Sequence, residues 1–238
     1  MLLFSLYIHT QTIHTFIQLS ASTLSIILYI TILLHSITIY CSRSIGTYTI
    51  YPFLSLLVCC CVRMIYGVIT DDMPTITSNM SGVAIGLFST VVYQYYSKQS
   101  HLDECLVGIT IVIVTLCLAF YRYTSLVGFI GSCLVVALMA SPLSSIKVVI
   151  RDQSTASMSF ATSIVNWCNG IVWLFYGYLF KDDPSIYIPN AIGLGLSSIQ
   201  LSLFAMYSST PVSETDPYSH ERTTISPISI RVKDSSDK

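Results

Sequence analysis

The sequence has little charge. Only 10% of its 238 residues are Asp, Glu, Lys or Arg, whereas a soluble domain usually carries about 25%. Hydrophobic residues make up 53%, and the mean hydropathy is +0.70. Polar side chains are therefore too few to cover a water-soluble globule of this length. The charged residues stand between long apolar stretches, a pattern typical of helices that cross a bilayer.

The sequence also lacks the patterns of common catalytic and metal sites. None of its eight cysteines forms a C-x-x-C pair with histidines at metal-binding spacing, and most lie in apolar runs. It has no recognisable nucleophile–base pair and no Gly-rich phosphate loop. We therefore expect no enzyme, with no catalytic residue, cofactor or metal. The net charge of −1 gives no reason to expect nucleic-acid binding.

Seven apolar stretches come close to the roughly 20 residues that a helix needs to cross a bilayer. They are residues 16–40, 48–69, 75–97, 103–120, 123–148, 157–180 and 184–207. We expect residues 1–15 to form a lead-in to the first helix. Residues 208–238 are rich in Ser, Thr, Pro and charge, which predicts a disordered cytosolic tail.

Basic residues in the connections favour one orientation. With the N-terminus outside, the inner connections carry Arg43, Lys98, Lys147 and Arg151, and the outer ones carry Arg122 and Lys181. The sequence therefore predicts an external N-terminus and a cytosolic C-terminus. The plasma membrane is the favoured location, and the Golgi or another endomembrane is the alternative.

The two halves of the chain repeat each other. Residues 66–76 read YGVITDDMPTI and residues 176–186 read YGYLFKDDPSI, a match at an offset of 110. With one extra residue, Asn79 then pairs with Asn190. The offset pairs helices one, two and three with five, six and seven, and leaves the fourth unpaired.

The unpaired helix gives the two units the same orientation in the membrane. The predicted fold is therefore an all-α membrane protein with two parallel three-helix repeats, residues 16–97 and 123–207. A linker helix within residues 98–122 joins them in a 3+1+3 arrangement. Transporters are commonly built this way, with the substrate bound between the repeats near the midplane.

The second half resembles the SWEET (MtN3/saliva-type) sugar transporter family. The matching residues are Ala140-Ser141-Pro142-Leu143, Val149-Ile150, Ser154, Met158, Phe160, Asn169-Gly170, Trp173, Tyr176-Gly177, Pro189-Asn190, Gly193, Gln200-Leu201 and Tyr207. The first half is more divergent and keeps Ser44, Pro52-Phe53, Tyr66-Gly67 and Asn79. The resemblance implies a passive, bidirectional uniporter of mono- or disaccharides that alternates access by rocking two triple-helix bundles. Its partners would be a small sugar and the bilayer, and homo-oligomer formation stays open.

Asn79 and Asn190 are the leading candidates for sugar contact. A carboxamide offers two donors and an acceptor to neighbouring hydroxyls, and such a group is costly in an apolar helix without a partner. Their equivalent positions predict that they face each other across the pore. The resemblance assigns them to sugar binding, whereas the alternative is that each bridges helices within its own bundle.

Four further residues are expected to line the pocket. The resemblance implies that Trp173 stacks on the sugar, although an interfacial tryptophan is the alternative. Asn169 lies one helical turn earlier on the same face, and Cys59 is its repeat equivalent. Arg63 is the equivalent of Trp173 and departs from the aromatic residue usual in the family. It either lines the pore and contacts solute, or extends outward toward Asp71 or Asp72.

The resemblance also implies a gate and hinges. Tyr66, Tyr176 and Asp183 are expected to close the outer mouth through phenol–carboxylate hydrogen bonds, with Asp182 competing for the role of Asp183. The alternative is that these acids merely end helices in water.

Pro52, Pro142 and Pro189 are the expected hinge prolines, because proline deletes a helical hydrogen bond.

Two other functions are the alternatives to sugar transport. A seven-helix receptor or sensor would not need a parallel three-helix repeat. A repeat-built carrier for another small solute, when coupled to protons, would need an acidic residue within a helix. Apart from Asp103 and Glu104 at the very start of the fourth, no Asp or Glu falls inside a predicted span, so the sequence favours passive transport.

Overall fold

The computed structural model describes residues 2–156 and 158–207, and these residues form helices without strands. The predicted tail, residues 208–238, lies outside the described residues. The helices are α1 (Leu2–Ser42), α2 (Tyr51–Ile69), α3 (Met73–Tyr96), α4 (Leu102–Phe120), α5 (Thr124–Leu138), α6 (Ala140–Asp152), α7 (Phe160–Phe175), a π-helical turn η1 (Tyr176–Lys181) and α8 (Pro184–Met206).

These helices make seven spans, as predicted. Six are long and apolar enough to cross a membrane: Thr15–Ser42, Tyr51–Ile69, Met73–Tyr96, Leu102–Phe120, Thr124–Asp152 and Pro184–Met206. The seventh is α7, which continues directly into η1 and ends at Lys181.

Two spans differ in detail from the predicted boundaries. The stretch expected as a lead-in is helical from Leu2 and runs without a break into α1. The fifth span is interrupted at Met139, which separates α5 from α6. Pro142 explains the interruption, since it lacks an N–H and its ring would clash with the carbonyl of Leu138 in a continuous helix.

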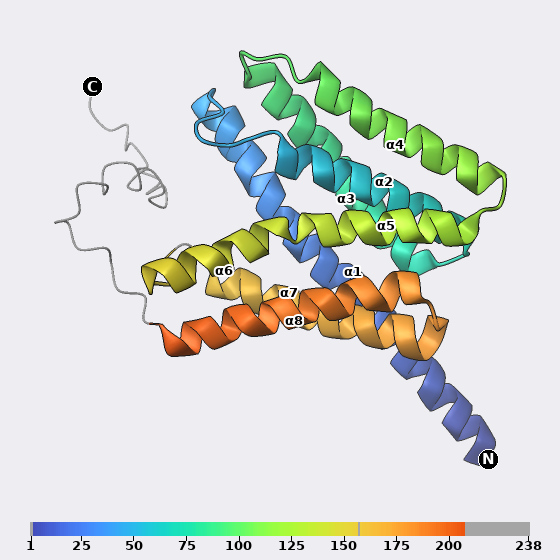
Figure 1. Ribbon diagram of the computed structural model, residues 1–238. Helices are drawn as coiled ribbons and strands as arrows, with labels where there is room; N and C mark the ends of the chain where they lie inside the picture. Colours follow the sequence, from blue (N-terminus) through green and yellow to red (C-terminus); the bar gives the residue numbers. More distant parts are fainter. Residues whose placement is uncertain (1, 157, 208–238) are drawn as a thin grey trace, which may run out of the picture.

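The spans pack as two bundles of the same design. In the first, α3 packs against both α1 and α2; in the second, α8 packs against both α5 and α7. The linker α4 lies against α2 and α5 (Figure 1). The bundles meet through α2 with α5 and through α1 with α7.

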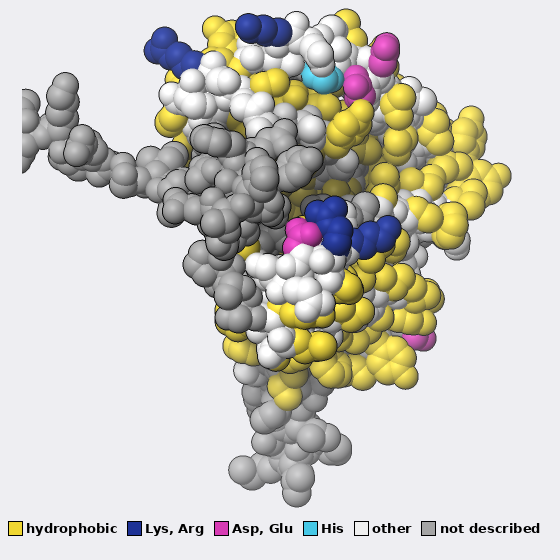
Figure 2. Space-filling model, turned by 60° about the vertical axis from the view of Figure 1, so that its left-hand side comes forward, with side chains coloured by type: hydrophobic (Ala, Val, Ile, Leu, Met, Phe, Trp, Pro, Cys, Tyr) yellow, Lys and Arg dark blue, Asp and Glu magenta, His cyan; other side chains and the backbone are white. Residues whose placement is uncertain are grey.

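The connections lie at two opposite ends of the molecule (Figure 1). Connections 43–50, 97–101 and 153–159 form one end, called here the C-terminal face, and connections 70–72, 121–123 and 182–183 form the other, the N-terminal face. The bundles lie close together at the N-terminal face and diverge toward the C-terminal face. Figure 2 turns the C-terminal face forward and shows Lys and Arg side chains gathered on it, with hydrophobic side chains covering the flank.

The repeat is visible in the backbone itself. Arg43 and Gln153, 110 residues apart, follow the first helix of each repeat with left-handed φ angles of 52° and 53°. Asp71 and Asp182, 111 residues apart, do the same before the last helix of each repeat, with φ angles of 51° and 49°. Asp adopts this conformation more readily than most residues.

The turn η1 accounts for the change of offset. Asp72 N donates to Gly67 O at 2.8 Å, and Asp183 N donates to Gly177 O at 3.0 Å. The second repeat therefore accommodates its extra residue between Gly177 and Asp183, within the wider π-helical turn. The sequence alignment placed that residue after Ile186, so its pairing of Asp72 with Asp182 is corrected to Asp72 with Asp183.

Candidate functional site

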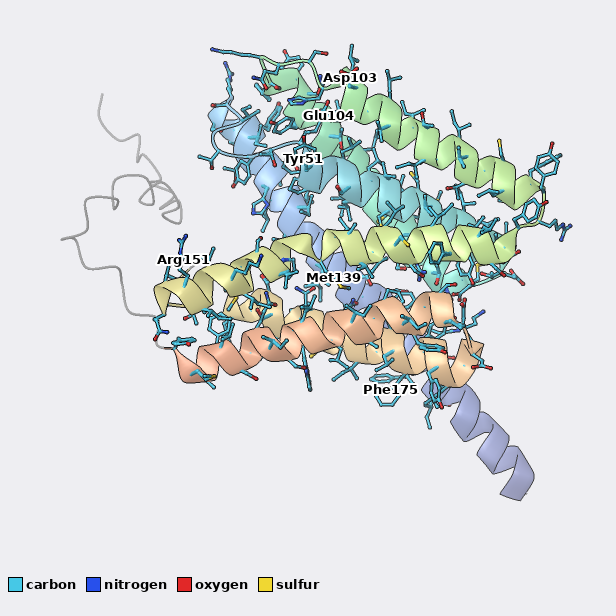
Figure 3. All side chains as sticks on the ribbon, viewed as in Figure 1. Tyr51, Asp103, Glu104, Met139, Arg151 and Phe175 are labelled. Atoms are coloured by element: carbon cyan, nitrogen blue, oxygen red, sulfur yellow. The ribbon has the colours of Figure 1, made fainter. Side chains whose placement is uncertain are left out.

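A cavity of about 250 Å³ lies between the two repeats. Six of its lining residues are those predicted to bind substrate: Cys59, Arg63, Asn79, Asn169, Trp173 and Asn190. Three come from each repeat. Met139 also lines the cavity, and Figure 3 places it at the junction of α5 and α6, whereas Phe175 points away from the bundle.

The two asparagines are held in the same way. Asn79 Nδ2 donates to Thr75 O and Asn190 Nδ2 donates to Ile186 O, each at 2.7 Å and each one turn back in its own helix. One amide proton is thus used to fix each side chain, and Asn79 Nδ2 also lies 3.5 Å from Ser78 Oγ. Neither carboxamide oxygen accepts a hydrogen bond from the described residues. The pair presents two acceptors and further donor capacity to the same cavity.

Trp173 and Asn169 are connected through Ser25 of α1. Trp173 Nε1 donates to Ser25 Oγ at 2.9 Å, and Ser25 Oγ donates to Asn169 Oδ1 at 3.1 Å. Trp173 is only 6% exposed, so it is not an interfacial tryptophan in this structure. Ser25 fixes both side chains from the opposite bundle, and sequence reasoning missed it because a serine in an apolar helix carries no distinctive signal.

Arg63 follows neither sequence expectation completely. Its side chain lines the cavity and is 6% exposed. Its Nη1 donates to the backbone carbonyl of Ser185 in α8 at 2.9 Å, rather than extending to Asp71 or Asp72. Its guanidinium carbon also lies 5.8 Å from the centre of the Tyr66 ring, within cation–π range.

At the N-terminal face, tyrosines of each repeat form hydrogen bonds with aspartates of the other repeat. Tyr66 donates to Asp183 Oδ2 at 2.5 Å, and Tyr176 donates to Asp72 Oδ1. Each tyrosine thus binds the aspartate that begins the last helix of the other repeat. Asp183, not Asp182, is the partner of Tyr66.

The aspartate pair is supported by further contacts. Asp72 is 1% exposed and accepts from Thr75 Oγ1 at 2.5 Å, and Lys181 Nζ lies 3.4 Å from its Oδ1. Asp183 Oδ1 accepts from Ser185 N at 2.9 Å. Sequence reasoning missed Asp72. The internal repeat pairs Asp72 with Asp183 only when the extra residue is placed within η1. Placing that residue after Ile186 paired Asp72 with Asp182 instead.

The Tyr-Gly pair in each repeat has a packing reason. A Cβ on Gly67 would lie 3.1 Å from Ile76 N, and a Cβ on Gly177 would lie 2.9 Å from Tyr187 N. Real Cβ atoms rarely approach backbone so closely. Glycine therefore lets the last helix of each repeat approach the helix that carries the tyrosine, which places each aspartate beside the other repeat.

The three prolines occupy different positions. Pro52 lies in the first turn of α2, where a missing N–H costs no hydrogen bond. Pro142 follows the break at Met139. Pro189 lies inside α8, one residue before Asn190, and is buried.

The cavity wall carries no carboxylate among its lining residues. Among the described residues, no group of three His, Cys, Asp or Glu side chains could hold a metal ion. The wall instead offers amide, hydroxyl, indole and guanidinium groups, which together suit a small solute rich in hydroxyls.

Comparison with known proteins matches both repeats to one family. The family model described as "Sugar efflux transporter for intercellular exchange" matches residues 15–101 and 125–211, two segments offset by the same 110 residues. The bidirectional sugar transporter SWEET4 of Arabidopsis thaliana is 31% identical over 204 residues, covering 79% of this chain and 80% of the relative. The sugar transporter SWEET1 of Dictyostelium discoideum is 25% identical over 209 residues, covering 83% and 94%.

The fold is also that of a solved structure. A eukaryotic SWEET transporter superposes with a TM-score of 0.67 at 24% identity, covering 83% of this chain and 100% of that one. At this identity the likeness concerns the fold.

Proposed function

This chain belongs to the SWEET (MtN3/saliva-type) family of sugar transporters, and we propose that it carries a monosaccharide passively across a membrane by alternating access. The observation that supports this most strongly is the pair of equivalent asparagines on one cavity between the repeats. Relatives named bidirectional sugar transporters point to the same activity.

The cavity favours a single sugar ring. Its volume of about 250 Å³ lies just below the range of roughly 300–1,000 Å³ typical of small-molecule pockets. Trp173 offers an aromatic face for the C–H face of a pyranose, and Asn79 and Asn190 offer hydrogen bonds to its hydroxyls from opposite sides. A disaccharide would need a wider cavity than this conformation provides.

The composition of the cavity wall supports passive transport. Proton-coupled carriers generally use an acidic side chain within the membrane, and none lies among the residues that line this cavity. Transport also requires no covalent step, so an enzymatic role is not part of the proposal.

We assign the N-terminal face to the outside of the cell. The C-terminal face carries the basic residues Arg43, Lys98 and Arg151 in or beside its connections, and such residues favour the cytosolic side. The crosswise Tyr–Asp bonds then close the outer mouth, and their breakage accompanies opening. The plasma membrane remains the favoured location.

The receptor and the carrier of a non-sugar solute are not favoured, because the family match covers both repeats and the relatives are named sugar transporters.

Uptake by cells that lack their own sugar transporters tests the proposal. Labelled glucose, fructose and sucrose would each be supplied to cells producing the wild-type chain or Asn190→Ala at matched surface expression. We expect uptake of a monosaccharide in preference to sucrose, and its loss in the variant. Wild-type cells that take up none of the three sugars would contradict the proposal.

A further inference from the structure

Beyond the paired tyrosines, we propose that Arg63 is a positioning residue that latches the N-terminal face shut by binding the backbone carbonyl of Ser185. The latch joins α2 of the first repeat to α8 of the second. It rests on the proposed alternating-access function, because only a carrier that opens at this face must break it.

Pro189 makes the carbonyl of Ser185 available. In a regular α-helix that oxygen would accept the N–H of residue 189, but proline has none. Two side chains take its place: Arg63 Nη1 at 2.9 Å and Ser132 Oγ at 3.0 Å. Ser132 belongs to α5 of the same repeat as Ser185, so only the bond from Arg63 crosses between the bundles.

Arg63 and Tyr66 both form hydrogen bonds with the start of α8. Tyr66 donates to Asp183 Oδ2 while Arg63 donates to Ser185 O, and Ser185 N itself donates to Asp183 Oδ1. The Arg63 guanidinium also lies near the Tyr66 ring, so the two side chains that bind α8 contact each other as well. Two points of attachment fix the orientation of α8 against α2, which the tyrosine bond alone would leave free to pivot.

The packing around the arginine stem fits this role. A Cβ on Gly131 of α5 would lie only 3.1 Å from Arg63 Cδ. Glycine at this position leaves room for the side chain to pass between α2 and α5 toward α8.

The first repeat has no counterpart of this latch. Pro74 is the equivalent of Ser185 at the offset of 111, and its carbonyl accepts from Ser78 Oγ of its own helix at 2.8 Å. Ser78 stands where the second repeat has Pro189. The equivalent of Arg63 is Trp173, which donates to a serine side chain instead. The arginine contact therefore strengthens one half of the closure only, whereas the other half has the ion pair of Lys181 with Asp72.

Accessibility of Cys59 from each side of the membrane tests the latch. Cys59 lines the cavity, so it would be kept as the single cysteine and treated with a membrane-impermeant methanethiosulfonate reagent in vesicles of either orientation. The readout is the modification rate from the N-terminal face divided by that from the C-terminal face. Because both rates concern the same thiol, any effect of a substitution on its intrinsic reactivity cancels in the ratio.

We expect Arg63→Met to raise this ratio about tenfold or more, the shift produced by losing one hydrogen bond from a charged donor. Arg63→Lys keeps the charge but reaches less far, so its ratio should lie between those of wild type and Arg63→Met. Ser132→Ala is the matched control. It removes the other donor to the same oxygen without touching a contact between bundles, and the ratio should stay near that of wild type.

An unchanged ratio in a folded Arg63→Met protein would overturn the latch. If that variant does not fold, Pro189→Ala decides the question, because it supplies an N–H that competes with Arg63 for the Ser185 carbonyl. A ratio at the wild-type value in Pro189→Ala would then overturn the proposal, and a raised ratio would support it. The assay uses no sugar, so its outcome is independent of whether sugar flux is found.

Discussion

In the first repeat, position 63 holds an arginine that binds the backbone of α8, whereas the equivalent position in the second repeat holds Trp173, which binds Ser25 of α1. Both side chains line the cavity and both reach into the other bundle. The two repeats thus share a backbone plan but use different chemistry at the surface where they meet.

Some features of the closed arrangement are present in both repeats, and others are present in only one. The asparagines, the tyrosines and the helix-starting aspartates are present in both repeats and make equivalent bonds. The internal proline and the π-helical turn occur in the second repeat alone. We infer that binding and crosswise closure are shared functions, and that the bending of α8 and the arginine contact are one-sided.

The asparagine pair should give the largest effect, because it is the shared element closest to solute. Asn79→Ala and Asn190→Ala each remove hydrogen bonds worth about 0.5–1.5 kcal/mol net apiece. We expect each variant to lose at least about tenfold in sugar flux while reaching the membrane normally. Flux would be measured as initial uptake at matched surface expression.

Thr77→Ala serves as the control for this pair. Thr77 bonds a carbonyl of its own helix as Asn79 does, but its side chain is exposed and does not line the cavity. Flux that survives in one asparagine variant and not in the other would show that the repeats do not contribute equally to binding.

Substitutions of the two crosswise tyrosines should have effects of different size, although the two hydrogen bonds are alike. Tyr176→Phe leaves Asp72 without one donor at a site that is 1% exposed, whereas Tyr66→Phe affects Asp183 at a partly exposed site. Because a buried carboxylate suffers more from losing a donor, we expect Tyr176→Phe to shift the closed state toward opening more strongly. The Cys59 accessibility ratio measures this shift, and a larger effect from Tyr66→Phe would refute the ranking.

Substitutions of Pro52 and Pro142 should also differ in their effect on flux. Pro142→Ala restores an N–H that could reconnect α5 with α6 across Met139, so we expect a straighter helix and a flux reduced by a few-fold. Pro52 lies in the first turn of α2, and Pro52→Ala should leave flux unchanged. Equal losses in both variants would argue that the break at Met139 does not act in transport.

The smallest effect is expected at the indole of Trp173. Trp173→Phe keeps an aromatic face but removes the bond to Ser25, and Ser25→Ala removes that bond together with the bond to Asn169. Each neutral hydrogen bond is worth about 0.5–1.5 kcal/mol, so apparent sugar affinity should weaken in both variants and more in Ser25→Ala. The double variant should be little worse than Ser25→Ala alone, as competition of unlabelled with labelled sugar can show; additive losses would contradict the proposed linkage.

Much of the fold could be predicted because it follows from apolar length and internal repetition. Those patterns indicated seven spans, parallel repeats and a linker helix, and the structure has them. The candidate site residues on the cavity could be predicted because the repeat and the resemblance placed Asn79, Asn190 and Trp173 at matching positions.

The rest depends on contacts that sequence spacing cannot reveal. The partner of Arg63 is a backbone carbonyl 122 residues away, freed by a proline in another helix. The aspartate pairing was obscured because Tyr176–Lys181 reads as ordinary helix, although it forms a π-helical turn that accommodates one extra residue. The resemblance assigned Pro52 as a hinge, but the sequence did not reveal that it lies in the first turn of α2.

Flux of a labelled monosaccharide in vesicles reconstituted with the purified protein tests the central claim most directly. The account predicts that sugar equilibrates down its gradient whether it starts inside or outside, that a protonophore has no effect, and that Asn190→Ala lowers the flux at least about tenfold. Accumulation above the external concentration that collapses when the protonophore is added would contradict passive transport by this cavity.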